Sequence, residues 1–117
     1  MEQLILHLIG DYIFQGDYLA QNKTKRHLPA LLHALIYSLP FLLLQPSWVA
    51  WSVIFVSHFF IDRYRLAKDL IIFINQVKDP GPFGYDKSKP DYMAFWLLII
   101  IDNTCHLVIN YLALKYL

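Results

Sequence analysis

Apolar residues gather in four long stretches of the chain, each with room for several helical turns. The predicted helices lie at about 3–21, 28–45, 48–76 and 92–116. Short polar turns separate the first three helices. A longer loop is predicted at 77–91, where three prolines and two glycines interrupt regular structure. We interpret this loop as a connector, with a lid over a site as the alternative.

The length of these stretches indicates membrane-spanning helices. A helix needs about 20 apolar residues, with a range of about 17–25, to cross a hydrocarbon core about 30 Å thick. The second and fourth stretches meet this length, and the third does with its neighbours included. The first carries His7, Asp11 and Gln15, but a helix facing a bundle interior can carry polar groups that lipid never meets. The pattern predicts one all-α domain over 1–117, an integral membrane bundle of four transmembrane helices.

The composition supports the same class. Hydrophobic residues make up 57% of the 117 residues and charged residues 16%, whereas soluble domains have about 45–50% and about 25%. A soluble domain of this size needs more charge to cover its surface. The net charge of +1, without a basic stripe, gives no reason to expect nucleic acid as a partner. The lipid bilayer is the expected partner.

Lysine and arginine lie almost entirely in two connections. Three of the ten follow the first predicted helix, six lie between Asp62 and Asp91, and one lies near the C-terminus. Cytoplasmic loops of membrane proteins carry such an excess of basic residues. The sequence therefore predicts a multi-pass protein of the cytoplasmic (inner) membrane, with both basic loops in the cytoplasm and both termini outside.

Histidine and aspartate recur at one spacing inside the apolar stretches. Three pairs are four residues apart: His7 with Asp11, His58 with Asp62, and Asp102 with His106. Residues at this spacing share one helix face, with Cβ atoms about 5–6 Å apart. Each pair can therefore offer a nitrogen and an oxygen to one ion, and His33 would be the contribution of the second helix. Counted inward from the basic loops, one position on each helix falls in the cytoplasmic half of the bilayer, which favours one cluster: Asp11, His33, His58 with Asp62, and Asp102.

The three aspartates of this cluster need a compensating charge. A charged Asp at the centre of a spanning helix costs about 2.5–3.5 kcal/mol, and divalent cations would neutralise Asp11, Asp62 and Asp102. Seven candidate ligands exceed the four of a closed zinc site, which favours two ions, or one ion with supporting groups. Mixed imidazole and carboxylate ligands suit zinc or manganese, with iron as a further choice. Interhelical hydrogen bonding and a proton relay are the alternatives.

Three further residues are candidates for supporting or substrate-binding roles. Gln15 continues the face of the first pair towards the cytoplasm, and Arg65 continues the face of the second pair. The guanidinium of Arg65 suits a phosphate or a carboxylate, although a solvated helix end explains both residues equally well. Asn103 follows Asp102 directly and is a candidate hydrogen-bond donor to the ligands.

Four segments carry a resemblance to a known family: 6–15, 20–23, 58–62 and 102–107. They resemble the small bacterial and phage membrane proteins called domain of unknown function 3307, and the resemblance covers nearly the whole chain. More distantly, the layout is similar to the YdjM-like membrane-bound metal-dependent hydrolases. The resemblance implies that the seven His and Asp residues are the family's polar positions. The chain departs from the family in having Asn103 where Gln is frequent.

We therefore expect a membrane-embedded metal-dependent hydrolase. A metal ion lowers the pKa of bound water towards about 7 and polarises the bond attacked, so no nucleophilic Ser or Cys is required. A site in the cytoplasmic leaflet predicts a lipid-linked or amphiphilic ester or phosphoester as substrate. Asp11 and Asp102 are the candidate catalytic carboxylates, one of them acting as general base.

Two other functions stay open at this point. One is a non-catalytic membrane module, a phage or bacterial inhibitor or anchor, with a structural metal site. The other is a small protein that conducts protons or ions, which would require a homo-oligomer because four spans show no inverted repeat. An open coordination position separates an enzyme from a structural site, because structural zinc sites are closed.

Overall fold

The computed structural model describes all residues, 1–117, and confirms an all-helical protein. In chain order the helices are α1 (Glu2–Leu8), the π-helix η1 (Ile9–Ile13), α2 (Asp17–Asn22), α3 (His27–Ser38), the 3₁₀-helix η2 (Leu39–Leu44), α4 (Trp48–Tyr64), α5 (Leu66–Asn75) and α6 (Asp91–Tyr116).

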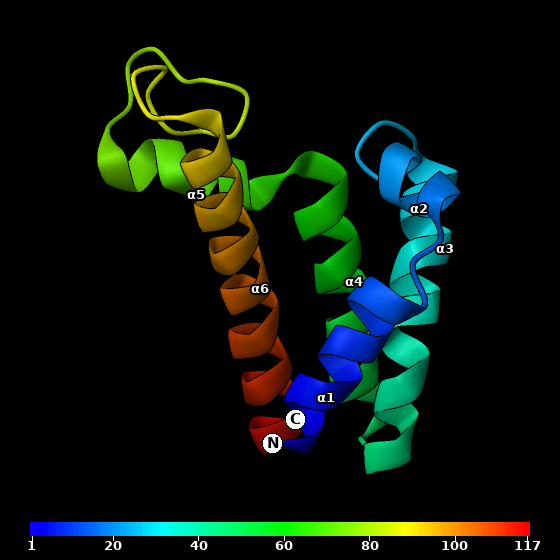
Figure 1. Cartoon of the computed structure of the whole chain (residues 1–117). Helices are drawn as coiled ribbons and strands as arrows, with labels where there is room; N and C mark the ends of the chain where they lie inside the picture. The colour runs from blue at the N-terminus through cyan, green and yellow to red at the C-terminus, as the bar shows by residue number, and fades with distance from the viewer.

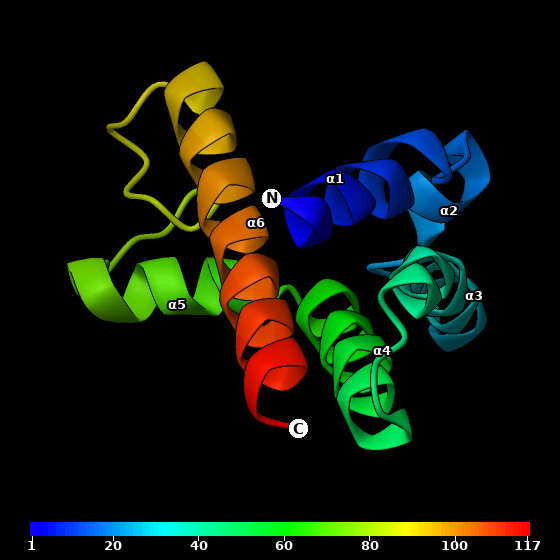
Figure 2. The same ribbon diagram turned by 90° about the horizontal axis from the view of Figure 1, so that it is seen from below.

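Three long helices, α3, α4 and α6, form the body of the molecule, and α1 with η1 crosses between α3 and α6 (Figures 1 and 2). Both termini lie at one end of this body (Figure 1). The turn before α4 lies at the same end, because the Ser47 hydroxyl donates a hydrogen bond of 2.8 Å to the Leu117 carbonyl. The α2–α3 turn and the loop before α6 lie at the opposite end (Figure 1).

The helix predicted at about 3–21 is interrupted. The π-helix η1 follows α1, and the chain then leaves the helical conformation before α2, with Gly16 extended at φ −74° and ψ 162°. Glycine is among the weakest helix formers, which favours a break there. The break lets α2 fold back beside α3 (Figure 2). The chain segment that follows η1 thereby packs against α3 on the outside of the bundle.

The helix predicted at about 48–76 is also divided. Arg65 adopts the left-handed conformation, at φ 53° and ψ 47°, between α4 and α5. As a result α5 lies across the end of the bundle, beside α6 (Figure 1). Ala67 and Ile71, four residues apart, are buried on one face of α5, and a straight continuation of α4 would carry them away from the bundle. In the second predicted helix, Pro40 near the start of η2 tightens the last turns, because proline has no N–H to donate.

Two helical segments, not the predicted four, are long and apolar enough to cross a membrane: His27–Leu44 and Asp91–Tyr116. The 17 residues of α4 reach only about 26 Å at ~1.5 Å per residue, and α1 with η1 is shorter still. There are fewer candidate spans than predicted because the breaks at Gly16 and Arg65 each end a predicted span early.

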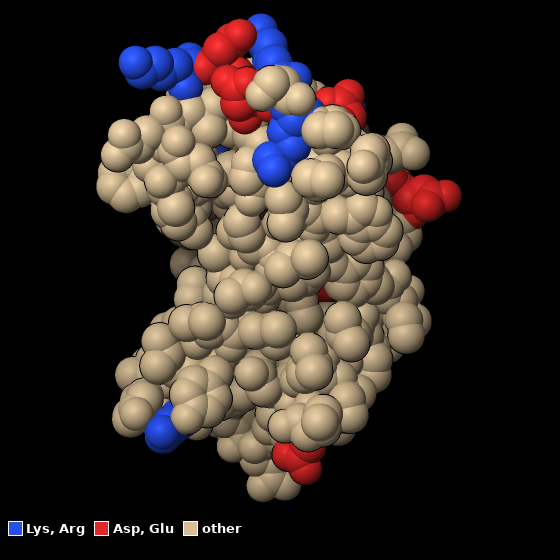
Figure 3. Space-filling model, turned by 60° about the vertical axis from the view of Figure 1, so that its left-hand side comes forward, with Lys and Arg blue, Asp and Glu red and all other residues tan.

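The surface is unusually apolar for its size. Only 24 of the 117 residues are buried, and many large apolar side chains are exposed, among them Leu43, Trp48 and Phe73. Charged side chains gather at the end that carries α5 and the loop after it, and a broad band below shows almost none on the face drawn (Figure 3). The chain therefore places its polar residues at one end and inside the bundle, and its apolar residues outside.

Gly10 marks the closest approach between η1 and α3, and it yields a matched pair of variants. A Cβ atom at Gly10 would lie 2.8 Å from the Tyr37 carbonyl oxygen and 2.9 Å from its ring. We expect Gly10→Ala to lower the free energy of unfolding by about 1–3 kcal/mol, since backbone must move to relieve the overlap. Gly16→Ala, with no atom within 4 Å, should cost less than about 1 kcal/mol. Thermal unfolding of the purified variants tests this, and equal effects at both positions would contradict it.

Candidate metal centre

The structure brings the seven predicted His and Asp residues to neighbouring positions between α1, η1, α3, α4 and α6. Six of them are buried: His7, Asp11, His33, His58, Asp62 and His106. The Asp102 side chain is 28% exposed. Six of the seven converge from separate helices, all except His7, and the contacts below show which atoms meet.

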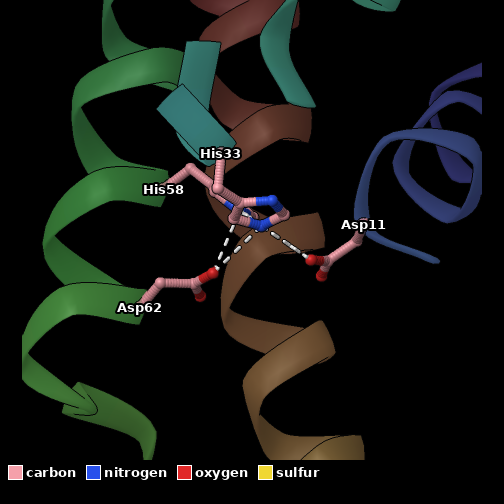
Figure 4. Close-up of side chains that lie close together, drawn as sticks. All are labelled: Asp11, His33, His58 and Asp62. Carbon is pink, nitrogen blue, oxygen red and sulfur yellow. Dashed lines mark hydrogen bonds and ion pairs between the residues drawn. The ribbon is translucent and has the colours of Figure 1, made fainter. Parts of the chain in front are cut away.

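Four of these residues form one compact group, which we call the His33 group: Asp11, His33, His58 and Asp62 (Figure 4). Nε2 of His33 lies 2.9 Å from Nε2 of His58, 3.1 Å from an Asp11 oxygen and 3.2 Å from Asp62 Oδ2. Nε2 of His58 lies 3.2 Å from the same Asp62 oxygen and 3.9 Å from Asp11. Ligand atoms at about 2.1 Å from a tetrahedral ion are separated by about 3.4 Å, so these spacings fit a single ion.

The atoms that converge in the His33 group are mainly acceptors. A neutral imidazole carries one proton, so its second nitrogen offers a lone pair, and an ionised carboxylate only accepts. Nδ1 of His33 and Nδ1 of His58 lie on the outer side of their rings and have no hydrogen-bond partner. Nε2 of each ring therefore faces the other ring and the carboxylates at the centre. Such an arrangement requires a cation, a proton or a donor between the groups.

A second group adjoins the first and shares a ligand with it. This His106 group consists of Asp11, Asp102 and His106, whose ligand atoms all lie within 4.8 Å of one another. Nε2 of His106 is 3.1 Å from Asp62 Oδ1 and 3.5 Å from Asp102 Oδ2. Asp62 thus presents Oδ2 to the His33 group and Oδ1 to His106. Shared carboxylates of this kind are the means by which proteins hold two metal ions about 3.5–4 Å apart.

His7 belongs to neither group, although the sequence spacing paired it with Asp11. Its Nδ1 lies 2.8 Å from the Tyr37 hydroxyl and its Nε2 lies 2.7 Å from Asn103 Oδ1. Asn110 donates to the Tyr37 hydroxyl at 2.6 Å, and Asn103 donates to the Tyr12 hydroxyl at 2.6 Å. In this series of hydrogen bonds the Tyr37 hydroxyl donates to Nδ1 of His7, and Nε2–H of His7 donates to Asn103, which fixes the tautomer of His7. His7 and Asn103 therefore support the centre from outside it.

Lys23 is the contributor that the sequence did not reveal. Its ammonium nitrogen lies 2.7 Å from Asp62 Oδ2, 3.6 Å from Asp11 Oδ1 and 3.4 Å from His33 Nε2. Burial disfavours the charged ammonium, but the Asp62 and Asp11 carboxylates outweigh this effect and hold the pKa of Lys23 above its usual range. Lys23 follows the chain break at Gly16, so no helical spacing connects it to the ligands.

Tyr37 was also not identified from the sequence as part of the site, although its spacing from His33 could have indicated it. It lies four residues after His33 on the same helix, the spacing that identified the other pairs. Its ring stacks on His58 with centroids 3.6 Å apart and planes 13° apart. The buried Tyr37 ring therefore restricts the orientation of one candidate ligand.

A cleft with a volume of about 400 Å³ opens beside both groups. Asp11, Asp62 and Asp102 line it. Its other polar lining residues include Gln15, Lys23, Arg65 and Lys68, and its apolar lining includes Ile61, Phe95, Leu98 and Ile99. The Gln15 side-chain oxygen is buried without a hydrogen-bond partner, and Arg65 donates to the Pro82 carbonyl at 3.2 Å. Both predicted supporting residues thus border the cleft, which combines basic and apolar walls.

Comparison with known sequences returns one family. The sequence model of the family described as "Protein of unknown function (DUF3307)" matches residues 1–116. No curated protein and no solved structure matches the chain. The more distant resemblance to YdjM-like hydrolases stays a prediction, since none of these comparisons supports it.

Proposed function

The chain belongs to the DUF3307 family, and we propose that it is a membrane-embedded, metal-dependent hydrolase that acts on a lipid-linked or amphiphilic ester or phosphoester. One observation carries the proposal: two groups of metal-ligating side chains adjoin an open cleft. Asp102 is partly exposed to that cleft, whereas structural zinc sites are closed by four protein ligands. The arrangement leaves room for water and substrate beside the ligands.

The residues around the cleft can perform hydrolysis as follows. A bound metal ion would acidify a water molecule and polarise the bond to be broken. Asp102 is the candidate general base, because its carboxylate is the most exposed of the three and touches the ligand His106 at 3.5 Å. The oxygen of water attacks the carbonyl carbon or the phosphorus atom, its proton passes to Asp102, and the leaving alcohol receives that proton. Zinc or manganese fits the mixed ligands, with one or two ions.

The walls of the cleft support an amphiphilic substrate. Lys23, Arg65 and Lys68 line one part and suit an anionic group, while Phe95 and Ile99 line another and suit a hydrocarbon chain. A soluble anionic substrate would have no use for the apolar wall. A neutral lipid would offer no negative charge for the three basic residues to bind.

Metal analysis combined with a substrate panel tests the proposal. The protein is purified in detergent without chelators and its metal content is measured, with lipid phosphoesters and esters as candidate substrates. We expect one or two zinc or manganese ions per chain, turnover of an amphiphilic ester or phosphoester, and loss of turnover on chelation that the metal restores. A protein that binds no metal and turns over no substrate would contradict the proposal.

One observation favours a non-catalytic alternative, in which the chain is a membrane module that binds a host protein. The Lys23 ammonium already compensates Asp62 and Asp11, so the bundle is held together by its own ion pairs. A stable, metal-free and catalytically inactive protein is the outcome that this alternative expects.

We further propose that the bundle lies in the cytoplasmic membrane with its charged end in the cytoplasm and both termini outside. The exposed apolar surface, the two segments of spanning length and the basic residues gathered at one end support this orientation. In this arrangement α5 lies at the level of the lipid head groups, because it crosses the end of the bundle (Figure 1).

Cysteine labelling in intact cells tests the orientation. In a Cys105→Ser background, we expect Leu117→Cys to react with a membrane-impermeant maleimide and Ser88→Cys to react only after permeabilisation. Both positions are exposed and lie at opposite ends of the chain's fold, so each variant is the control for the other. Labelling of Ser88→Cys alone in intact cells would show that the orientation is the opposite of the one proposed.

A further inference from the structure

Lys23 contacts the same atoms that would hold a metal ion in the His33 group. Its ammonium lies 2.7 Å from Asp62 Oδ2, which is also 3.2 Å from Nε2 of both His33 and His58. The Lys23 side chain is only 17% exposed, so it lies within the cluster and does not merely border it. An ion and this ammonium therefore compete for one carboxylate oxygen.

Both cations cannot occupy these positions together. A zinc ion bound to Asp62 Oδ2 would lie about 2.0–2.2 Å from that oxygen. At 3.4 Å from His33 Nε2 and 3.6 Å from Asp11 Oδ1, the ammonium lies close to two of the other three ligands as well. Like charges at such a short separation repel strongly. Either the ammonium leaves when the metal enters, or the metal is excluded.

The geometry of the cleft points to a place for the displaced ammonium. We propose, on the premise that the metal centre proposed above exists, that Lys23 is displaced by the metal and then binds an anionic group of the substrate in the cleft. Lys23 lines this cleft together with Arg65 and Lys68, and its flexible four-carbon stem allows the movement. Metal entry thereby creates a site with three basic residues. The substrate is accordingly an anionic amphiphile, such as a phosphoester, and not a neutral ester.

A matched pair of variants tests the competition. Lys23→Gln removes the competing charge, while Lys25→Gln removes the exposed charge of Lys25 in the same turn. Zinc and manganese affinities are measured on chelator-stripped protein in detergent by competition with a chromophoric chelator. We expect Lys23→Gln to bind metal at least about tenfold more tightly than wild type, because the ion no longer displaces a charge-assisted hydrogen bond. We expect Lys25→Gln to match wild type.

Chemical labelling of the wild-type protein tests the displacement without a mutation. An amine-reactive reagent is applied with and without manganese, and the modified lysines are identified by mass spectrometry. We expect manganese to raise the labelling rate of Lys23 severalfold and to leave Lys25 unchanged. Glycerol 3-phosphate, added to the manganese-loaded protein, should protect Lys23 again if the freed ammonium binds an anionic group.

The possible results separate this inference from the proposed function. Metal binding by wild type with unchanged Lys23 labelling and no gain in Lys23→Gln would overturn the displacement and leave the metal centre intact. Metal-dependent exposure of Lys23 without protection by glycerol 3-phosphate would overturn the role in substrate binding alone. Binding by neither wild type nor Lys23→Gln would overturn the metal centre, and this inference with it.

Discussion

Asp62→Asn is expected to lose the bound metal and to destabilise the protein. Asp62 Oδ2 contacts His33, His58 and Lys23, and Oδ1 contacts His106 at 3.1 Å. Removing a group that only hydrogen-bonds to a metal ligand already lowers metal affinity by about 10–100-fold. Removing Asp62, a direct ligand, should therefore lower it by more than about 100-fold. Because the substitution also leaves the Lys23 ammonium without its nearest partner, we expect the metal-free protein to lose about 3 kcal/mol of stability.

The control for this variant is Asp69→Asn, which removes an exposed carboxylate on α5. Elemental analysis and thermal unfolding are measured on both proteins. We expect Asp69→Asn to keep its metal and to stay within about 0.5 kcal/mol of wild type. If Asp62→Asn kept its metal, Asp62 would not be a ligand, and if it also kept full stability, the cluster would be held by hydrogen bonds that an amide can replace.

Asp102→Asn is expected to lower turnover strongly while the fold and the ion of the His33 group are retained. Asp102 is the most exposed carboxylate of the cluster, and its one ion-pair contact is with His106 at 3.5 Å. General base catalysis contributes about 10²–10⁴-fold to rate, and we expect kcat to fall by that factor. Stability should change by less than about 0.5 kcal/mol, since the side chain is partly solvated.

Asp91→Asn is the matched control for Asp102→Asn, because Asp91 is an exposed aspartate at the start of the same helix. Turnover, metal content and unfolding are compared among the three proteins. Retained turnover in Asp102→Asn would exclude Asp102 as the base. Asp11→Asn then becomes the informative variant, because Asp11 is shared by both groups.

The i, i+4 spacing in the sequence correctly predicted that the two side chains meet in two of the three His–Asp pairs. His58 and Asp62 lie within 3.2 Å on α4, and Asp102 and His106 lie within 3.5 Å on α6. Both pairs lie on regular α-helix, where residues four apart share a face. The spacing failed for His7, because both of its ring nitrogens form hydrogen bonds elsewhere, to the Tyr37 hydroxyl and to Asn103 Oδ1.

The parts of the fold that the sequence did not predict are its two breaks. The predicted helices ran through Gly16 and Arg65, because hydropathy alone does not show where the backbone turns. The conformation of Arg65 depends on the packing of Ala67 and Ile71 at the end of the bundle, which is a tertiary effect. The position of Lys23 depends on the first break. A charge that indicates a cytoplasmic loop by its sequence position therefore lies against buried carboxylates.

The hydrogen bond between His7 and Asn103 also has a consequence for biogenesis. It joins residues separated by 96 positions, so α1 can form this hydrogen bond only after α6 has been made. In the membrane protein proposed here, α1 and η1 are too short and too polar to enter lipid alone. We therefore expect a chain truncated before α6 to leave Nε2 of His7 without its partner, while Nδ1 keeps its contact with the Tyr37 hydroxyl on α3.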